Sequence, residues 1–188
     1  MEKLSQPPQL AQFLRDFHQK DSYNKFCVDC NKNESSHASV TYGILLCQEC
    51  SEYHKINFGM ENSYIKSLFD ELWDEYQLKC LELGGNKRFW DFMKLYNSEW
   101  KSMDAKYKSK ESKYYKKRLT AQVQGREFTE EPPARNVEEA LNRGVGSAKE
   151  LAGKAEDGLK TFGNYLGNKI TQSGVKDKFK GLFNKNQQ

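Results

Sequence analysis

The chain has 188 residues, of which 30% are charged and 37% are hydrophobic, and its formal net charge is +4. Its mean hydropathy is -0.92 and it contains no run of about 18 apolar residues, so the sequence does not predict a transmembrane helix. The first residues lack the apolar stretch of a secretory signal. The small excess of positive charge does not by itself indicate nucleic-acid binding.

The first predicted element is an amphipathic helix over residues 9–20, directly after Pro7 and Pro8. Its apolar residues recur at the three- and four-residue steps of one helix face, at positions 10, 13, 14 and 17. Residues 24–55 follow as a cysteine-rich module. Within this module, residues 38–46 have the β-branched and aromatic content that is typical of one or two strands.

Helical patterns dominate the middle of the chain. They predict helices over residues 48–57, 70–82 and 86–96, and one longer helix over 99–124. Between positions 101 and 118, that last helix carries eight basic residues and only two acidic ones. We interpret its basic face as either solvated or turned toward anionic lipid or an acidic partner. The expected core residues of this region are Trp73, Cys80, Phe89, Trp90 and Phe92.

The sequence Glu-Glu-Pro-Pro at 130–133 predicts the end of the globular part, which we place at residues 1–130. We interpret 131–143 as a linker and 144–188 as a tail that holds eight of the chain's thirteen glycines. Apolar residues between Val145 and Ile170 still fall on one face of a helix. Because each glycine costs about 0.8–1.0 kcal/mol in a helix, we expect this amphipathic tail to become helical only against a membrane or protein surface.

Four of the five cysteines form two pairs, and the pairs predict a metal site. Cys27, Cys30, Cys47 and Cys50 are spaced C-x2-C-x16-C-x2-C, which suits one tetrahedral Zn²⁺. His37 and His54 are alternative ligands, but four thiolates already complete the coordination. Because a catalytic zinc needs an open position, we expect a structural ion. The predicted fold is α+β and mostly α: a C4 zinc finger with a small β-sheet, surrounded by helices and followed by the helical tail.

The cysteine pattern and the residues around it resemble the Arf GTPase-activating (ArfGAP) domain family. The family motif continues from the last cysteine as C-S-G-x-H-R. It also carries Ala-Ser-Val between the pairs, and Gly-Gly-Asn further on. The matching residues here are Ser51, His54, Ala38-Ser39-Val40, Tyr42-Gly43, Ser67-Leu68, Trp73, Leu78 and Gly84-Gly85-Asn86. Ala105-Lys106-Tyr107 and Gly125-Arg126-Glu127-Phe128 resemble the Golgi-type branch. The resemblance covers about residues 9–130.

The resemblance implies a domain that accelerates GTP hydrolysis on an Arf-type small GTPase by lending it an arginine finger in trans. Such a finger is worth about 10³ to 10⁵ in rate. At the finger position this chain has Lys55, which keeps the charge but lacks the planar fork of a guanidinium. Glu52 and His37 also replace a glycine and a tryptophan of the motif. We therefore expect Lys55, with Ser51, Glu52, His54 and His37 around it, to face the GTPase, and its activating effect to be lost or weakened.

Two other functions remain open from the sequence. One is an active GTPase activator of Golgi or endosomal traffic. The other is a non-catalytic accessory subunit of a large membrane-associated assembly, such as a respiratory complex of the mitochondrial inner membrane, with or without an Arf-like GTPase as its partner. The expected location is cytoplasmic and peripheral to Golgi or endosomal membranes, with the mitochondrial assembly as the alternative. Nucleic acid is not an expected partner, because the basic residues lie outside the finger, with no base-reading helix beside it.

Overall fold

The structure is a computed structural model, and it describes residues 6–143. Its helices are α1 (Pro8–Lys20), α2 (Ser22–Lys25), α3 (Gln48–Asn57), α4 (Gly59–Asn62), α5 (Glu75–Leu83), α6 (Asn86–Lys94), α7 (Met103–Lys108), α8 (Lys110–Val123) and α9 (Val137–Asn142), and its strands are β1 (His37–Ser39), β2 (Ile44–Leu46) and β3 (Ile65–Ser67). The chain divides into two units, 1–133 and 134–188, and α9 is the described element of the second. Among the residues described, no helix is long and apolar enough to cross a bilayer.

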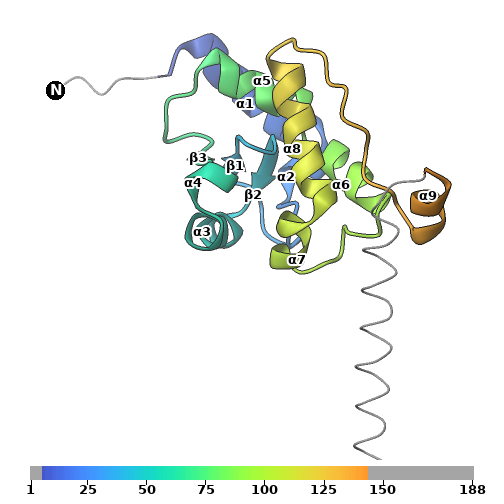
Figure 1. Ribbon diagram of the computed structural model, residues 1–188. Coiled ribbons are helices and arrows are strands. Elements are labelled where there is room, and N and C mark those ends of the chain that lie inside the picture. The colour runs from blue at the N-terminus through green and yellow to red at the C-terminus, as the bar shows by residue number, and fades with distance from the viewer. Residues whose placement is uncertain (1–5, 144–188) are drawn as a thin grey trace, which may run out of the picture. The chain divides into compact units, whose positions relative to one another are not determined.

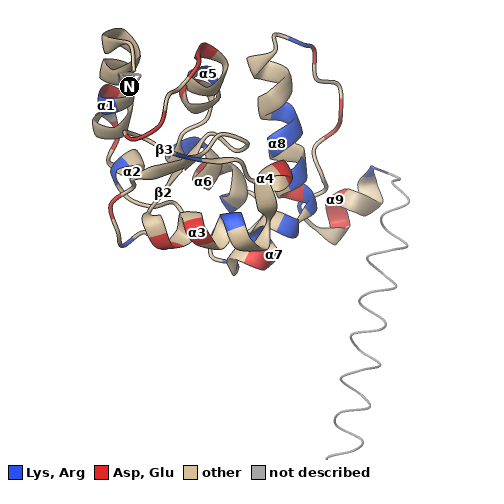
Figure 2. Ribbon diagram, turned by 90° about the vertical axis from the view of Figure 1, so that its left-hand side faces the viewer, with Lys and Arg blue, Asp and Glu red and all other residues tan. Residues whose placement is uncertain are grey.

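The centre of the first unit is a three-stranded antiparallel sheet in the order β2-β1-β3. Ala38 of β1 pairs with Leu45 on one side and with Lys66 on the other, so β1 is enclosed by hydrogen bonds at both edges. In both views α3 lies on the opposite side of this sheet from α1 and α5 (Figures 1 and 2). The predicted fold class, mostly helical around a small sheet, is confirmed.

The structure corrects several predicted elements. The expected helix over 99–124 is two helices, because Ser109 adopts an extended backbone and its hydroxyl caps the start of α8. The helix expected over 70–82 begins only at Glu75, after Asp74 forms a capping box with Gln77. Strand β3 and the short helices α2 and α4 were not predicted. Helix α9 forms inside the segment interpreted as a linker, and the helical tail lies outside the described residues.

Two glycines bring the strand turn and the end of α5 into direct backbone contact. Gly43 has φ of +61°, and a Cβ there would lie 2.2 Å from the carbonyl oxygen of Cys80. A Cβ at Gly84 would lie 2.5 Å from the carbonyl oxygen of Gly43. The amide of Gly85 donates to that same oxygen at 2.7 Å. Side chains at positions 43 and 84 would separate the turn from the helix, so the motif needs glycine at both.

Asn86 joins three segments through one side chain, at the first residue of α6. Its Oδ1 accepts from the amide of Leu45 in β2 at 2.6 Å. Its Nδ2 donates to the carbonyls of Tyr23, Phe26 and Leu45 at 2.8 to 3.2 Å. The residue is 1% exposed, so water cannot replace these bonds. Asn86 thus holds α6 to β2 and to the segment that leads into the first cysteine pair.

The expected core residues are only in part fully enclosed. Trp73, Cys80 and Phe89 are 4%, 4% and 1% exposed, as predicted. Trp90 and Phe92 are half-buried. Trp90 packs edge-on against the exposed Trp100, at 4.7 Å between ring centroids. Helix α6 therefore presents one aromatic face to the core and another toward the surface.

Candidate metal centre and the surface at Lys55

Two short turns present the four cysteine sulfurs to one point. Cys27 and Cys30 lie in a turn that the amide of Asn31 closes by donating to the Cys27 carbonyl at 2.9 Å. Asn31 has φ of 50°, a backbone region in which asparagine is more common than most residues. Cys47 is the N-cap of α3, and Cys50 lies in its first turn. The helix N-terminus favours negative charge on this second pair, but burial raises the pKa of Cys47 and the hydrogen bond with Cys27 raises the pKa of Cys50, so a bound cation is needed for both to be thiolates.

The arrangement fits a tetrahedral metal ion. Four sulfurs about 2.3 Å from a Zn²⁺ ion lie about 3.8 Å from one another. The sulfurs of Cys30 and Cys47 are 3.8 Å apart, and all four lie within 4.8 Å of one another. The hydrogen bond with Cys50 lowers the pKa of Cys27 to about 5, and the same bond raises the pKa of Cys50. Four thiols this close cannot all ionise unless a cation neutralises them, and this donor set suits Zn²⁺.

Behind the metal centre, a buried carboxylate collects polar groups from three parts of the chain. Asp29 lies between Cys27 and Cys30, and its side chain is 1% exposed. It accepts from Nε2 of His54 at 3.0 Å, from Nζ of Lys106 at 3.1 Å and from the hydroxyl of Tyr107 at 2.9 Å. Burial raises the pKa of Asp29, but the bond to His54 and the charge of Lys106 outweigh it, so the pKa is lowered. Asp29 therefore joins the first cysteine turn to α3 and α7.

The hydrogen bonds continue from His54 into the sheet. If Nε2 donates to Asp29, then Nδ1 of a neutral ring accepts from the Ser63 hydroxyl, 2.7 Å away. The Ser63 oxygen in turn lies 2.8 Å from the hydroxyl of Ser39 in β1. Asp29, His54 and Ser63 are linked in the order of a hydrolase triad, but Ser63 is 2% exposed and no substrate can reach it. The chain of bonds is structural, and it fixes α3 against the sheet.

Removing the charge of Lys106 is expected to destabilise the domain strongly. The Lys106→Met variant leaves Asp29 with one buried partner charge fewer, and breaking a buried ion pair costs about 3 to 5 kcal/mol. Chemical unfolding followed by circular dichroism, with zinc in excess, measures this loss. Lys108→Met is the matched control, because Lys108 is 68% exposed in its pair with Asp104 and should cost less than about 1 kcal/mol. Equal unfolding midpoints for both variants would show that Asp29 does not need Lys106.

Lys55 lies on the exposed side of α3, near its C-terminal end. In the part of the chain that the structure describes, it makes no hydrogen bond or ion pair. Burial of His37, at the start of β1, lowers the pKa of this histidine, and the positive charge of Lys55 lowers it further. Lys55 is therefore close enough to His37 to act on it electrostatically.

Two large apolar side chains follow Lys55 along the chain, Ile56 at 81% and Met60 at 74% exposure. Glu52, one turn earlier, is exposed and accepts a hydrogen bond from Gln48. We call Glu52, Lys55, Ile56 and Met60 the α3 surface.

The residues predicted to face the GTPase differ in their exposure. Ser51 and His54 are each 0% exposed, so their side chains support the α3 surface from beneath and offer no contact to a partner. His37 is half-buried, whereas Glu52 and Lys55 face solvent as predicted. The buried partner Asp29 was not predicted, although an acidic residue inside a C-x2-C turn is a signal that the sequence carries. The exposed Ile56 and Met60 were not predicted either.

Residues 11–132 match the family described as "Putative GTPase activating protein for Arf". ADP-ribosylation factor GTPase-activating protein 3 of Bos taurus is 36% identical over 99 residues, which cover 52% of this chain and 19% of that protein. ADP-ribosylation factor GTPase-activating protein GCS1 of Saccharomyces cerevisiae is 28% identical over 113 residues, 60% of this chain and 32% of that protein.

A solved structure of a putative GTPase activating protein for ADP ribosylation factor from Cryptosporidium parvum is 22% identical in sequence. The match covers 60% of this chain and 93% of that chain, with a TM-score of 0.49. This chain spans about a fifth of the length of the Bos taurus protein and about a third of the length of the Saccharomyces cerevisiae protein.

The fold and the site define a zinc-finger domain in which a four-cysteine metal centre is packed between a small sheet and helices. The family match covers more than half of the sequence, and the chain belongs to the ArfGAP family. The four clustered cysteines accordingly form a structural zinc site. The assignment of Cys27, Cys30, Cys47 and Cys50 as the ligand cluster agrees with their predicted pairing.

Proposed function

We propose that this domain recognises an Arf-type small GTPase through the α3 surface and stimulates its GTP hydrolysis weakly or not at all. The observation that carries the proposal is the position of Lys55. It is an exposed cation with no intramolecular partner among the described residues, and Ile56 and Met60, which follow it in the sequence, are among the most exposed apolar side chains of the part of the chain that the structure describes. A cation that has no internal partner is available to a phosphate. Exposed apolar side chains beside it are typical of a protein-binding surface.

The chemistry of lysine accounts for the weak stimulation that we propose. Catalysis of phosphoryl transfer consists mainly of positioning and of stabilising charge on the transferred group. The ammonium of Lys55 supplies charge, but it is a compact, strongly hydrated donor on a flexible stem. It cannot donate two parallel hydrogen bonds to a phosphate oxygen and a neighbouring carbonyl, as a guanidinium can. Glu52 adds a negative charge one turn away, which opposes the approach of phosphates.

Substituting the most exposed apolar residue of this surface is expected to weaken GTPase binding. In Ile56→Asp, a charge replaces a side chain that is 81% exposed, so the fold should tolerate the change while an apolar contact is lost. Binding of the full chain to an Arf-type GTPase loaded with a non-hydrolysable GTP analogue is measured by calorimetry, and we expect at least about a tenfold loss, or 1.4 kcal/mol.

Leu95→Asp is the control, because Leu95 is 56% exposed on the segment that follows α6, away from α3. Failure of the unmodified chain to bind in either nucleotide state would refute the proposed function. Equal binding by both variants would refute the proposed surface.

We propose that this activity takes place at the cytoplasmic surface of Golgi or endosomal membranes, as the resemblance to the Golgi-type branch implies. The names of the two relatives support the proposed target, an ADP-ribosylation factor. The rival accessory role in a mitochondrial assembly makes a different prediction. A tagged chain would then co-migrate with a large particle in detergent extracts, whereas a transient regulator would elute near its own mass of 21.9 kDa.

The proposed contact of the tail with a membrane or a protein lies outside the described residues, and deleting residues 144–188 tests it in the same experiment.

A further inference from the structure

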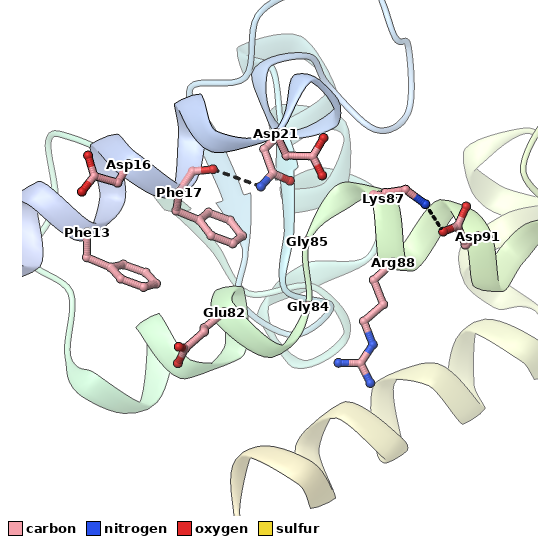
Figure 3. Close-up of a pocket in the computed structure, with 11 residues that line it drawn as sticks. Phe13, Asp16, Phe17, Asp21, Glu82, Gly84, Gly85, Lys87, Arg88 and Asp91 are labelled. Atoms are coloured by element: carbon pink, nitrogen blue, oxygen red, sulfur yellow. Dashed lines mark hydrogen bonds and ion pairs between the residues drawn. The ribbon is translucent and has the colours of Figure 1, made fainter.

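A cavity of about 660 Å³ opens between α1 and the corner where α5 meets α6. Figure 3 shows its lining: Phe13, Asp16 and Phe17 come from α1, while Glu82, Gly84 and Gly85 come from the α5–α6 corner. Its volume lies within the range of about 300 to 1,000 Å³ that is typical of ligand pockets. The α3 surface lies on the other side of the sheet, so the proposed GTPase contact does not use this cavity (Figures 1 and 2).

The inner wall of the cavity is apolar and can accommodate a flat or branched apolar side chain. The rings of Phe13 and Phe17 stack at 5.9 Å between centroids and 11° between planes. Both are only half-buried, although they pack against the core at their inner edges. Gly85 adds space, because it has no side chain where a Cβ would lie 3.8 Å from the Phe17 ring. An apolar group that entered here would cover the exposed faces of both rings.

The walls of the cavity are held by buried hydrogen bonds. Asn24 is 5% exposed, and its Nδ2 donates to the carbonyl of Phe17 at 3.0 Å, drawn as a dashed line in Figure 3. Its Oδ1 accepts from the amide of Asn86 at 3.0 Å. These two bonds tie α1 to the start of α6 across the floor of the cavity. A ligand would meet a preformed site and would not have to order it first.

The charges that remain available to a ligand are negative. Lys87 is held by Asp91 at 2.5 Å and lies over the ring of Tyr23. Arg88 donates to the carbonyl of Leu83 and to Gln122 of α8, and in Figure 3 its guanidinium points toward that helix. In contrast, no described cation pairs with three lining carboxylates, which belong to Asp16, Asp21 and Glu82. The cavity is therefore acidic in a chain whose net charge is +4.

We propose that this cavity binds a short peptide segment of a partner protein, in which an apolar side chain packs on Phe13 and Phe17 and a neighbouring Lys or Arg pairs with Asp16 and Glu82. Asp16 and Glu82 are exposed, so the charges that they pair with stay near the surface while the apolar group is enclosed. This arrangement suits a partner peptide that lies across the rim of the cavity and inserts one side chain into it. The negative charge of the cavity lining repels an anionic membrane. The domain would thus bind a second protein while the α3 surface remains free.

Selection from a random library of dodecapeptides, panned on the full zinc-loaded chain, tests this proposal. We expect the selected sequences to share a leucine, phenylalanine or tryptophan within two residues of a lysine or arginine. A fluorescein-labelled selected peptide then reports affinity by polarisation. The double variant Asp16→Lys/Glu82→Lys reverses two exposed rim charges, and it should weaken the peptide at least about tenfold. Rising salt should weaken binding to the unmodified chain.

Glu131→Lys is the matched control, because Glu131 is exposed and lies outside the cavity lining, and it should leave affinity within about twofold. Selected peptides without a basic residue would overturn the proposal. Equal affinity of the double variant and the control would also overturn it. Binding of the double variant to the Arf-type GTPase should be unchanged, so failure here is distinguishable from failure of the proposed function.

Discussion

Lys55→Arg is expected to increase the stimulated rate of GTP hydrolysis on an Arf-type GTPase by about 10² to 10³. An arginine supplied in trans is worth about 10³ to 10⁵ in such reactions, and lysine keeps the charge but not the two-pronged donor geometry. The exposed position of Lys55 near the end of α3 leaves room for the longer guanidinium without a change in the core. Single-turnover hydrolysis of radiolabelled GTP, with the domain in excess over the GTPase, gives the rate directly.

Two control variants separate chemistry from docking. Lys55→Ala should lose whatever stimulation the lysine provides while binding persists through Ile56 and Met60. Lys79→Arg makes the same exchange at an exposed position of α5, and it should leave the rate unchanged. If the unmodified chain already matched Lys55→Arg, lysine would be a sufficient finger here. If Lys55→Arg bound the GTPase without any gain in rate, position 55 would not reach the phosphates.

Removing zinc is expected to unfold the first unit. Structural zinc binding contributes about 10 to 16 kcal/mol in zinc-finger peptides, and a whole domain is stable by only about 5 to 15 kcal/mol. All four cysteine sulfurs lie beside core residues, and Cys27, Cys47 and Cys50 are at most 8% exposed. Without zinc, the four cysteine thiols would remain buried and close to one another. Circular dichroism during titration with a strong chelator should show loss of helix, and added Zn²⁺ should restore it.

The fifth cysteine provides the control for this experiment. Cys50→Ser removes a ligand, so we expect loss of bound zinc and of the folded state. Cys80→Ser changes a buried thiol that lies outside the cluster, so zinc stoichiometry should stay at one and stability should fall only modestly. Retention of the full helical signal after complete removal of zinc would contradict a structural role for the ion.

Spacing alone was enough to predict the metal ligands and the bounds of α3, because both depend on residues close together in the chain. The boundary at Ser109 was missed because the residues on either side of it have the same helical pattern, and a single serine cap interrupts them. Strand β3 was missed because three residues, Ile-Lys-Ser, give almost no periodic signal. The Lys66 side chain in this strand is buried, and its ammonium donates hydrogen bonds to the carbonyl of Leu72 and to the side-chain oxygen of Gln77.

The exposure of a candidate site residue can be predicted where it follows from a helix position, but not where it depends on distant partners. Helical spacing puts Glu52 and Lys55 on one face of α3, as observed. The burial of His54 depends on Asp29 and Ser63, which lie 25 and 9 residues away in the chain. The ion pair between Asp29 and Lys106 spans 77 residues. Sequence patterns do not encode such pairings, and only the folded chain brings these groups together.

The Asn86 side chain also makes metal occupancy measurable at a residue that is not a ligand. Its amide protons are bonded to the segment that leads into Cys27 and to the strand that leads into Cys47, so they exchange with solvent only when both segments separate from α6. A nuclear magnetic resonance signal from that single NH₂ group would therefore persist in deuterated water while the ion stays bound. Its decay would record each opening of the finger.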